Sequence, residues 1–285
     1  MKTRPKLPPW IRVRIGAGTG REETAEILRS LNLNTVCAGA ECPNLHECWL
    51  KKTATFMILG DSCTRNCRFC AVNHTDNPLP PSSEEPANIA LAVRKMNLKY
   101  VVITSVTRDD LSDGGAGQFA AVIKSVTESV PDIKIEVLTP DYLDDNLRIV
   151  IDADPFVFNH NVETVERLSK QIRLKADYSR SLKTLEQAYN FSEGRIPVKS
   201  GLMVGMGESD KEIEQAILDI RSTGASMLTI GQYLPPSDSH WQLKRYVHPD
   251  IFEHWREFAL NAGFNKVASG PMVRSSYHAE ELHDL

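Results

Sequence analysis

The sequence predicts an α/β protein whose parallel sheet curls into a full or partial barrel. Six short segments rich in β-branched and apolar residues alternate with segments of helical periodicity. Strand-then-helix units in series favour parallel strands joined by right-handed crossovers. The length of 285 residues is normal for one barrel-like domain, and a composition with 41% hydrophobic and 25% charged residues excludes a disordered or collagen-like chain.

The expected elements cover most of the chain. A first helix is expected at 22–33, before the barrel. Strands are expected at 55–59, 100–105, 133–138, 155–159, 198–204 and 226–232. The helices between them are expected at 86–97, 118–130, 143–152, 162–170, 182–192 and 211–223. A last helix at 249–263 and an apolar run at 266–269 precede the tail 274–285.

Charge and hydropathy exclude several classes of partner. The net charge of −4 gives no overall cationic field, so nucleic acid and anionic membranes are not expected partners. No apolar run reaches the roughly 18 residues that a membrane-spanning helix requires, and the basic, proline-rich start is not followed by an apolar segment. We therefore expect a cytoplasmic protein.

All six cysteines lie between Cys37 and Cys70, in two groups of three. Disulfides that stabilise a fold are usually spread along the chain, and they form in secreted proteins. The clustering therefore favours metal binding over a disulfide framework.

The second triplet has the spacing Cys63-x3-Cys67-x2-Cys70, in a loop at 60–73 after the first expected barrel strand. In barrels of this type the chemistry lies at the carboxyl ends of the strands. Three thiolates can bind three irons of a cubane cluster and leave the fourth iron open to a small bidentate ligand. Zinc is the alternative, since His74 could supply a fourth ligand.

The first triplet has wider gaps, Cys37-x4-Cys42-x5-Cys48. A loop of this size can wrap three corners of another cubane, and its fourth ligand must then come from elsewhere. His46 is the nearest candidate. A locally hydrogen-bonded loop histidine is the alternative interpretation of that residue.

Here the pattern resembles a known family. The segment CTRNCRFC at 63–70 resembles the radical S-adenosylmethionine superfamily, and the upstream triplet is similar to its lipoyl synthase branch. The segments FNHNVET at 158–164, KSGLMVGMGE at 199–208 and GPMVRSSYHA at 270–279 match that branch in order and spacing. The resemblance implies a partial (β/α)6 TIM-like barrel at 53–248. It also implies an N-terminal extension at 1–52 and a C-terminal extension at 249–285, which together carry an auxiliary iron–sulfur cluster.

The resemblance further implies two 4Fe–4S clusters, with S-adenosylmethionine as co-substrate. The cluster ligands that generate the radical would be Cys63, Cys67 and Cys70. The open iron would chelate S-adenosylmethionine, and an electron would cleave it to methionine and a 5′-deoxyadenosyl radical.

The auxiliary cluster implied by the resemblance would be held by Cys37, Cys42 and Cys48. Its fourth ligand would be a serine of the segment RSSY at 274–277, and Ser276 is chosen over Ser275. A serine oxygen matches iron less well than a thiolate, so it can leave when the cluster reacts.

The implied reaction inserts two sulfur atoms, at carbons 6 and 8, into an octanoyl group on a lysine of a carrier protein. These C–H bonds are unactivated, which is why a radical is needed. The carrier would be an octanoylated lipoyl domain, either of the acyltransferase subunit of a 2-oxoacid dehydrogenase or of the glycine-cleavage carrier protein. Ferredoxin or flavodoxin would supply electrons.

Other contacts to the cofactor are expected around the barrel mouth. The resemblance implies that Phe69 lies beside the adenine, with core packing beneath the loop as the alternative. Polar groups at strand ends face the site in such barrels, with capping of the next helix as the alternative. These groups are Thr104, Ser105, Glu136, Asn159 and His160. Lys199 and Arg274 are candidates to pair with the cofactor carboxylate or with an acidic carrier surface.

Two other functions remain open from the sequence. One is a different two-cluster radical enzyme, such as a biotin-synthase-like sulfur inserter or a methylthiotransferase, although the early triplet and the RSSY segment weigh against it. The other is a structural zinc protein whose cysteine loops bind a partner. Metal content separates the zinc protein from a two-cluster enzyme, because two cubanes contain about eight irons whereas the zinc protein would contain only zinc.

Overall fold

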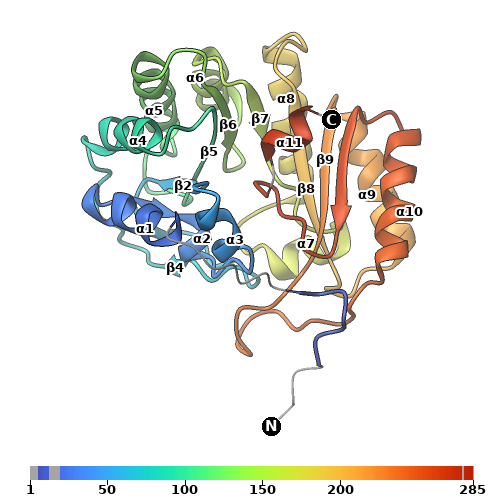
Figure 1. Ribbon diagram of the computed structural model, residues 1–285. Helices are drawn as coiled ribbons and strands as arrows, with labels where there is room; N and C mark the ends of the chain where they lie inside the picture. Colours follow the sequence, from blue (N-terminus) through green and yellow to red (C-terminus); the bar gives the residue numbers. More distant parts are fainter. Residues whose placement is uncertain (1–5, 13–19, 278, 285) are drawn as a thin grey trace.

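The framework of the protein is a curved, open sheet. The computed structural model describes residues 6–12, 20–277 and 279–284. Within these residues the main sheet has eight strands in the order β1-β2-β5-β6-β7-β8-β9-β10 (Figure 1). The strands are β1 (Asn34–Thr35), β2 (Thr55–Ile58), β5 (Tyr100–Ser105), β6 (Lys134–Leu138), β7 (Val157–Asn159), β8 (Val198–Val204), β9 (Met227–Gln232) and β10 (Lys266–Gly270). All neighbours pair in parallel except β1 and β2, which are antiparallel.

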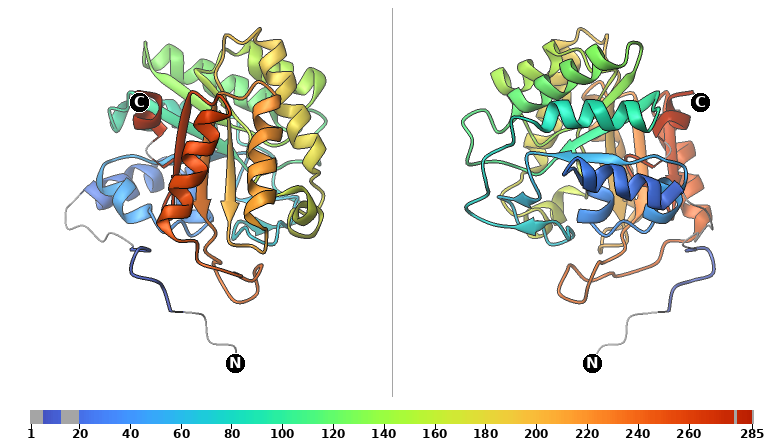
Figure 2. Two further views of the ribbon diagram at one scale, coloured as in Figure 1. Left: turned by 90° about the vertical axis from the view of Figure 1, so that its right-hand side faces the viewer. Right: turned by 60° about the vertical axis from the view of Figure 1, so that its left-hand side comes forward.

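Helices cover the outer face of this sheet, each in contact with the next (Figures 1 and 2). They are α4 (Glu85–Lys95), α5 (Ala116–Ser129), α6 (Asp144–Asp152), α8 (Tyr178–Phe191), α9 (Asp210–Ser222) and α10 (Pro249–Asn261). The main hydrophobic core lies between sheet and helices and includes Phe119, Phe158 and Trp255. None of the helices in the described ranges is long and apolar enough to cross a membrane.

Side chains alternate between the core and the barrel interior along each strand. On β5, Val101 and Ile103 belong to the core, whereas Thr104 lines a cavity inside the barrel. On β8, Lys199 and Gly201 share the interior face for the same reason. The expected α/β class and partial barrel are confirmed.

The segments on either side of the barrel join its sheet. α1 (Gly20–Ser30), α2 (Val36–Gly39) and α3 (Leu45–Leu50) carry or flank the first cysteine triplet, and β1 beside them pairs with β2. β10 pairs with β9 and leads into residues 271–277, which we call the strap. α11 (Ala279–Asp284) follows the strap. Of the expected extensions, residues 1–5, 13–19, 278 and 285 lie outside the described residues.

Most expected helices shift by one or two residues, and the helix expected at 182–192 begins earlier, at Tyr178. Two further helices differ for a reason that the backbone shows. The helix expected at 162–170 is α7 (Glu166–Ile172), because Glu163 has φ of 69° and its backbone bridges to Leu202 of β8. The helix expected at 22–33 ends at Ser30, because Asn32 has φ of 51°, which a continuing right-handed helix does not allow.

Candidate active site

Two adjacent cavities contain the cysteine triplets. The first, of about 340 Å³, lies at the carboxyl ends of the strands and is lined by Cys63, Cys67 and Cys70. The second, of about 310 Å³, is lined by Cys37, Cys42, Cys48 and Ser276. The two cavities share four lining residues, which are Val36, Cys42, Arg274 and Ser276. These four residues form a shared wall between the cavities, and one of them, Cys42, belongs to the first triplet.

The loop that carries the second triplet leaves β2 through a tight turn, with φ of 71° at Leu59 and 101° at Gly60. A short parallel pairing of β3 (Ser62–Cys63) with β4 (Asn73–His74) closes the base of the loop. The Cys63 Sγ accepts hydrogen bonds from the backbone N–H groups of Arg65 and Thr107, each at 3.3 Å. Backbone geometry thus holds this sulfur at the cavity wall.

The thiols of both triplets are free, and burial raises the pKa of several of them. Burial, reinforced by the neighbouring cysteines and partly offset by Arg173, raises the pKa of Cys67 to about 12. Burial likewise raises the pKa of Cys48 to about 12, with Cys37 and Cys42 adding to the effect. Bound metal converts such thiols into thiolates and releases their protons. Two groups of three mutually close thiols therefore fit two metal clusters.

The strap brings Ser276 to the first triplet. The Asn44 amide donates to the Met272 carbonyl at 2.8 Å, and the Tyr277 hydroxyl donates to Glu47 at 3.0 Å. Ser275 lines only the first cavity, and its hydroxyl donates to Asn161 at 2.8 Å. Since His46 lines neither cavity, Ser276 is the candidate fourth ligand that the structure brings to the triplet.

Two glycines on the inner face of the sheet make room for the strap. A Cβ atom at Gly231 would lie 2.1 Å from the Val273 carbonyl oxygen. At Gly201 it would lie 2.8 Å from the Ser275 hydroxyl oxygen. Real Cβ contacts are not this short. Because the atom facing Gly231 is backbone, that position requires glycine for the strap to approach, whereas at Gly201 the side chains of Ser275 and Asn161 would have to move.

The expected cofactor contacts fall into two groups. Phe69, Thr104 and Ser105 line the first cavity, and the buried Ser105 hydroxyl has no hydrogen-bond partner within the described residues. Glu136 and Asn159 line neither cavity, because their side chains bond to each other inside the barrel at 2.9 Å.

The two expected anion partners also differ from each other. Lys199 is fully buried and pairs with Glu136, so a carrier surface cannot reach it. Arg274 lines both cavities and donates to the Val273 carbonyl at 2.6 Å. Burial lowers its pKa, and it forms no ion pair with a carboxylate in the described part of the chain.

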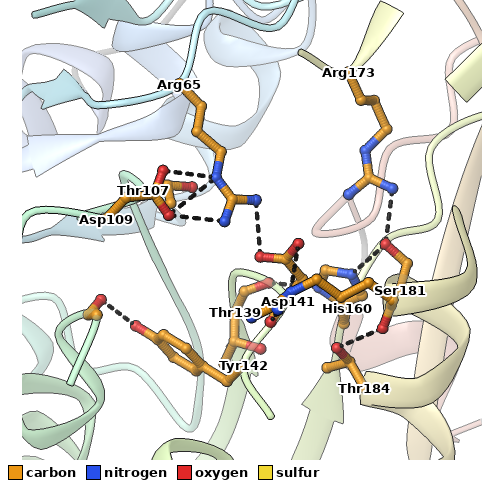
Figure 3. Close-up of polar contacts among 12 residues, drawn as sticks. Arg65, Thr107, Asp109, Thr139, Asp141, Tyr142, His160, Arg173, Ser181 and Thr184 are labelled. Carbon is orange, nitrogen blue, oxygen red and sulfur yellow. Dashed lines mark hydrogen bonds and ion pairs between the residues drawn. The ribbon is translucent and has the colours of Figure 1, made fainter. Parts of the chain in front are cut away.

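An ionic network that sequence patterns did not identify supports the first cavity (Figure 3). Arg65, from within the second triplet, binds Asp109 at 2.8 Å and Asp141 at 2.8 Å. Although burial opposes ionisation, the hydrogen bonds from Arg65 hold the pKa of Asp109 below its ordinary value. In the sequence, this network was visible only as an arginine between two cysteines. Its partners, Asp109 and Asp141, come from loops that are distant in the chain.

His160 also lines the first cavity (Figure 3). Its Nδ1 donates to the Thr139 carbonyl at 2.9 Å, and its Nε2 accepts from the Ser181 hydroxyl at 3.0 Å. Arg173 in turn donates to the Ser181 oxygen at 2.8 Å. Burial and then the charge of Arg173 lower the pKa of His160 to about 4, so the ring is neutral at neutral pH.

The zinc alternative receives no support from His74. Its Nδ1 lies 3.1 Å from the backbone carbonyl of Cys63, in the pairing that closes the loop. Among the residues described, no three histidine, cysteine, aspartate or glutamate side chains are close enough to share one ion. A cubane binds its thiolates at separate corners and does not need that convergence.

Comparison with known proteins identifies relatives over nearly the whole chain. The family model described as the radical SAM superfamily matches residues 57–220. The lipoyl synthase of Caldicellulosiruptor saccharolyticus is 51% identical over 278 residues, which cover 97% of this chain and 97% of that protein. The lipoyl synthase of Chlorobium limicola is 49% identical, with 99% of this chain and 96% of that protein covered.

A solved structure shares the fold at low sequence identity. The FeFe-hydrogenase maturase HydG from Carboxydothermus hydrogenoformans aligns with a TM-score of 0.59 at 13% identity. The alignment covers 93% of this chain and 79% of that one. It supports the barrel architecture alone.

Proposed function

Because the chain belongs to the lipoyl synthase family of the radical SAM superfamily, we propose that it inserts two sulfur atoms at carbons 6 and 8 of a protein-bound octanoyl-lysine. The observation that carries this proposal is the pair of adjacent thiol cavities, one lined by each triplet. The enzyme is thus a sulfurtransferase that uses S-adenosylmethionine and two 4Fe–4S clusters.

We assign the ligands of the radical-generating cluster to Cys63, Cys67 and Cys70, and those of the auxiliary cluster to Cys37, Cys42, Cys48 and Ser276. When bound, the first cluster supplies the electron that cleaves S-adenosylmethionine and the second supplies sulfur. The thiol groupings and the serine at the second cavity support this assignment.

The chain's own residues hold the reactants. We propose that Phe69, Thr104 and Ser105 contact S-adenosylmethionine, since they line the first cavity and the Ser105 hydroxyl has an unused hydrogen-bonding capacity. Apolar side chains such as Leu138 and Met203 line the same cavity. They would exclude water around an octanoyl chain and hold it against the shared wall.

Arg274 gives the shared wall a positive charge. A buried cation without an anionic partner is costly, and a bound anionic cluster or substrate group would reduce that cost. We therefore propose that Arg274 faces the auxiliary cluster from the wall between the cavities. The nearby Cys42 thiol, which as a thiolate would favour the charged guanidinium, supports this orientation.

The partner is a carrier protein with an octanoylated lipoyl domain. We propose the acyltransferase subunit of a 2-oxoacid dehydrogenase or the glycine-cleavage carrier protein, with ferredoxin or flavodoxin as electron donor. We also propose a cytoplasmic location, because six free cysteines suit a reducing compartment. The division into extensions at 1–52 and 249–285 around a barrel at 53–248 is likewise our proposal.

One experiment tests the function directly. The anaerobically purified protein is incubated with an octanoyl-lysine peptide, S-adenosylmethionine and a reductant, and the peptide is analysed by mass spectrometry. We expect a gain of two sulfur atoms. A peptide that stays unmodified while S-adenosylmethionine is cleaved would place the chain in another class of radical enzyme.

A further inference from the structure

A fully buried charge pair lies inside the barrel. Lys199 on β8 and Glu136 on β6 have no exposed side-chain surface, and the Lys199 Nζ lies 2.9 and 3.1 Å from the two oxygens of Glu136. The Tyr100 hydroxyl donates to Glu136 at 2.7 Å, and the Asn159 amide donates to it at 2.9 Å. The carboxylate therefore accepts hydrogen bonds from three other strands.

Stability alone does not account for this pair. Desolvation of two charges opposes their attraction, so replacing both partners of a buried pair by apolar residues is often neutral or stabilising. Removing one partner is costly, because the other charge is then left buried and unpaired. The contribution of Lys199 must therefore be sought in a contact that an apolar residue could not make.

Lys199 makes such a contact with the strap. An ammonium group has three N–H donors, and two of those on Lys199 point to Glu136. The third donates to the backbone carbonyl of Ser275, at 2.7 Å, the shortest of the three contacts. The charge pair thus connects the barrel interior to the segment that carries Ser276.

The position of this carbonyl gives the contact its significance. The Ser275 carbonyl belongs to the peptide group that precedes Ser276, and peptide groups are planar. Fixing the carbonyl therefore restricts the direction in which the Ser276 side chain leaves the backbone. Other contacts hold the Met272 carbonyl and the side chains of Ser275 and Tyr277. A turn from the Tyr277 N–H to the Arg274 carbonyl, at 3.0 Å, encloses Ser275 and Ser276 but fixes neither to the barrel.

We propose that Lys199 is a positioning residue for Ser276, and that Glu136 aims Lys199 at the strap. Lys199 fixes the depth of the strap inside the barrel, so that Ser276 reaches the cavity of the first cysteine triplet. This inference rests on the proposed function, in which Ser276 is the fourth ligand of the auxiliary cluster.

Two variants isolate the contact between Lys199 and the strap. Glu136→Gln removes the negative charge but retains the amine that donates to Ser275. Glu136→Gln combined with Lys199→Met removes both charges and, in addition, that donor. In both variants the new amide can donate to the Asn159 Oδ1, which is buried without a partner in the described structure. The two variants then differ in the Lys199 donor and in the unpaired ammonium that the single change leaves buried. Exchange of amides outside the strap, measured in the same experiment, corrects for that difference in global stability.

Amide hydrogen exchange of the strap is measured by mass spectrometry on the full chain, purified without oxygen. In the double variant we expect strap amides to exchange at least about tenfold faster than in Glu136→Gln, because a hydrogen bond from a charged donor is lost. We expect iron to fall from about eight toward about four per chain while S-adenosylmethionine cleavage continues.

Equal exchange rates and equal iron content in the two variants would overturn the inference. A double variant that fails to fold would also overturn it, because the pair would then act on the stability of the barrel. If the unmodified chain binds only one cluster, the proposed function fails. The exchange measurement would still decide whether Lys199 positions the strap.

Discussion

The glycine at position 231 allows the most direct test of the strap's role. A methyl group there would lie 2.1 Å from the Val273 carbonyl oxygen, whereas ordinary contact begins at 3.4 Å. The strap would have to retreat by about 1.3 Å to accommodate it. Contacts at the Met272 and Ser275 carbonyls, on either side of Val273, oppose that movement. We expect Gly231→Ala to cost about 1–3 kcal/mol of stability, as overpacked sites do.

The functional effect should fall mainly on sulfur insertion. A displacement of about 1 Å can reduce a rate by about 100-fold. We expect lipoyl product to fall by about that factor in Gly231→Ala. Formation of 5′-deoxyadenosine should fall much less than product formation, because Cys63, Cys67 and Cys70 lie on a different loop, although Gly231 and the strap also line the first cavity.

Gly270→Ala is the matched control. Gly270 is the register partner of Gly231 on the neighbouring strand, and a Cβ there would lie 3.5 Å from the Val273 side chain, in ordinary contact. This variant should behave like the unmodified enzyme. If Gly231→Ala forms product at the unmodified rate, the strap does not place the fourth ligand.

The remaining predictions concern the cysteines, the serine and the buried histidine. Cys67→Ala should abolish 5′-deoxyadenosine formation, measured by chromatography, because the radical-generating cluster loses a ligand. Cys42→Ala should retain that cleavage but form no lipoyl product, and full product formation would contradict the assignment of the triplets. Ser276→Ala should still assemble some auxiliary cluster, seen by iron analysis, with product sharply reduced; unimpaired turnover would point to another fourth ligand. The pKa of His160 is lower in the folded chain than in the unfolded chain, so the unfolded chain binds the proton more readily. The contribution of His160 to folding stability is therefore present above pH 6.5 and is lost as the pH falls toward 4. This loss should reach at most about 3 kcal/mol. Urea unfolding at pH 7 and pH 4.5 should show a smaller decrease in the free energy of unfolding for His160→Gln than for the unmodified chain. An equal decrease would locate the acid sensitivity in another group.

The barrel could be predicted largely from local patterns. The strands Tyr100–Ser105 and Val198–Val204 match the expected bounds, because runs of β-branched and apolar residues flanked by turns are typical of buried parallel strands. The two triplets were also visible locally, since ligand spacing is a property of one short segment.

Depth inside the barrel could not be predicted in the same way. Alternation along a strand indicates which face a side chain occupies but not how far it lies from the cavity. Glu136 and Asn159 were expected to contact the cofactor, but they are buried, bond to each other and line neither cavity. The strap contacts were beyond any local pattern, because Asn44 and Met272 are 228 residues apart.

That separation has a consequence for biosynthesis. The cysteines of the second cavity emerge early from the ribosome, whereas the segment that holds Ser276 is translated more than two hundred residues later. At a translation rate of about 5–20 residues per second, Ser276 is synthesised on the order of ten seconds or more after these cysteines. With Ser276 as the fourth ligand, as we propose, a nascent or truncated chain presents three of the four ligands. The proposed auxiliary cluster could then be completed only after the strap has been translated.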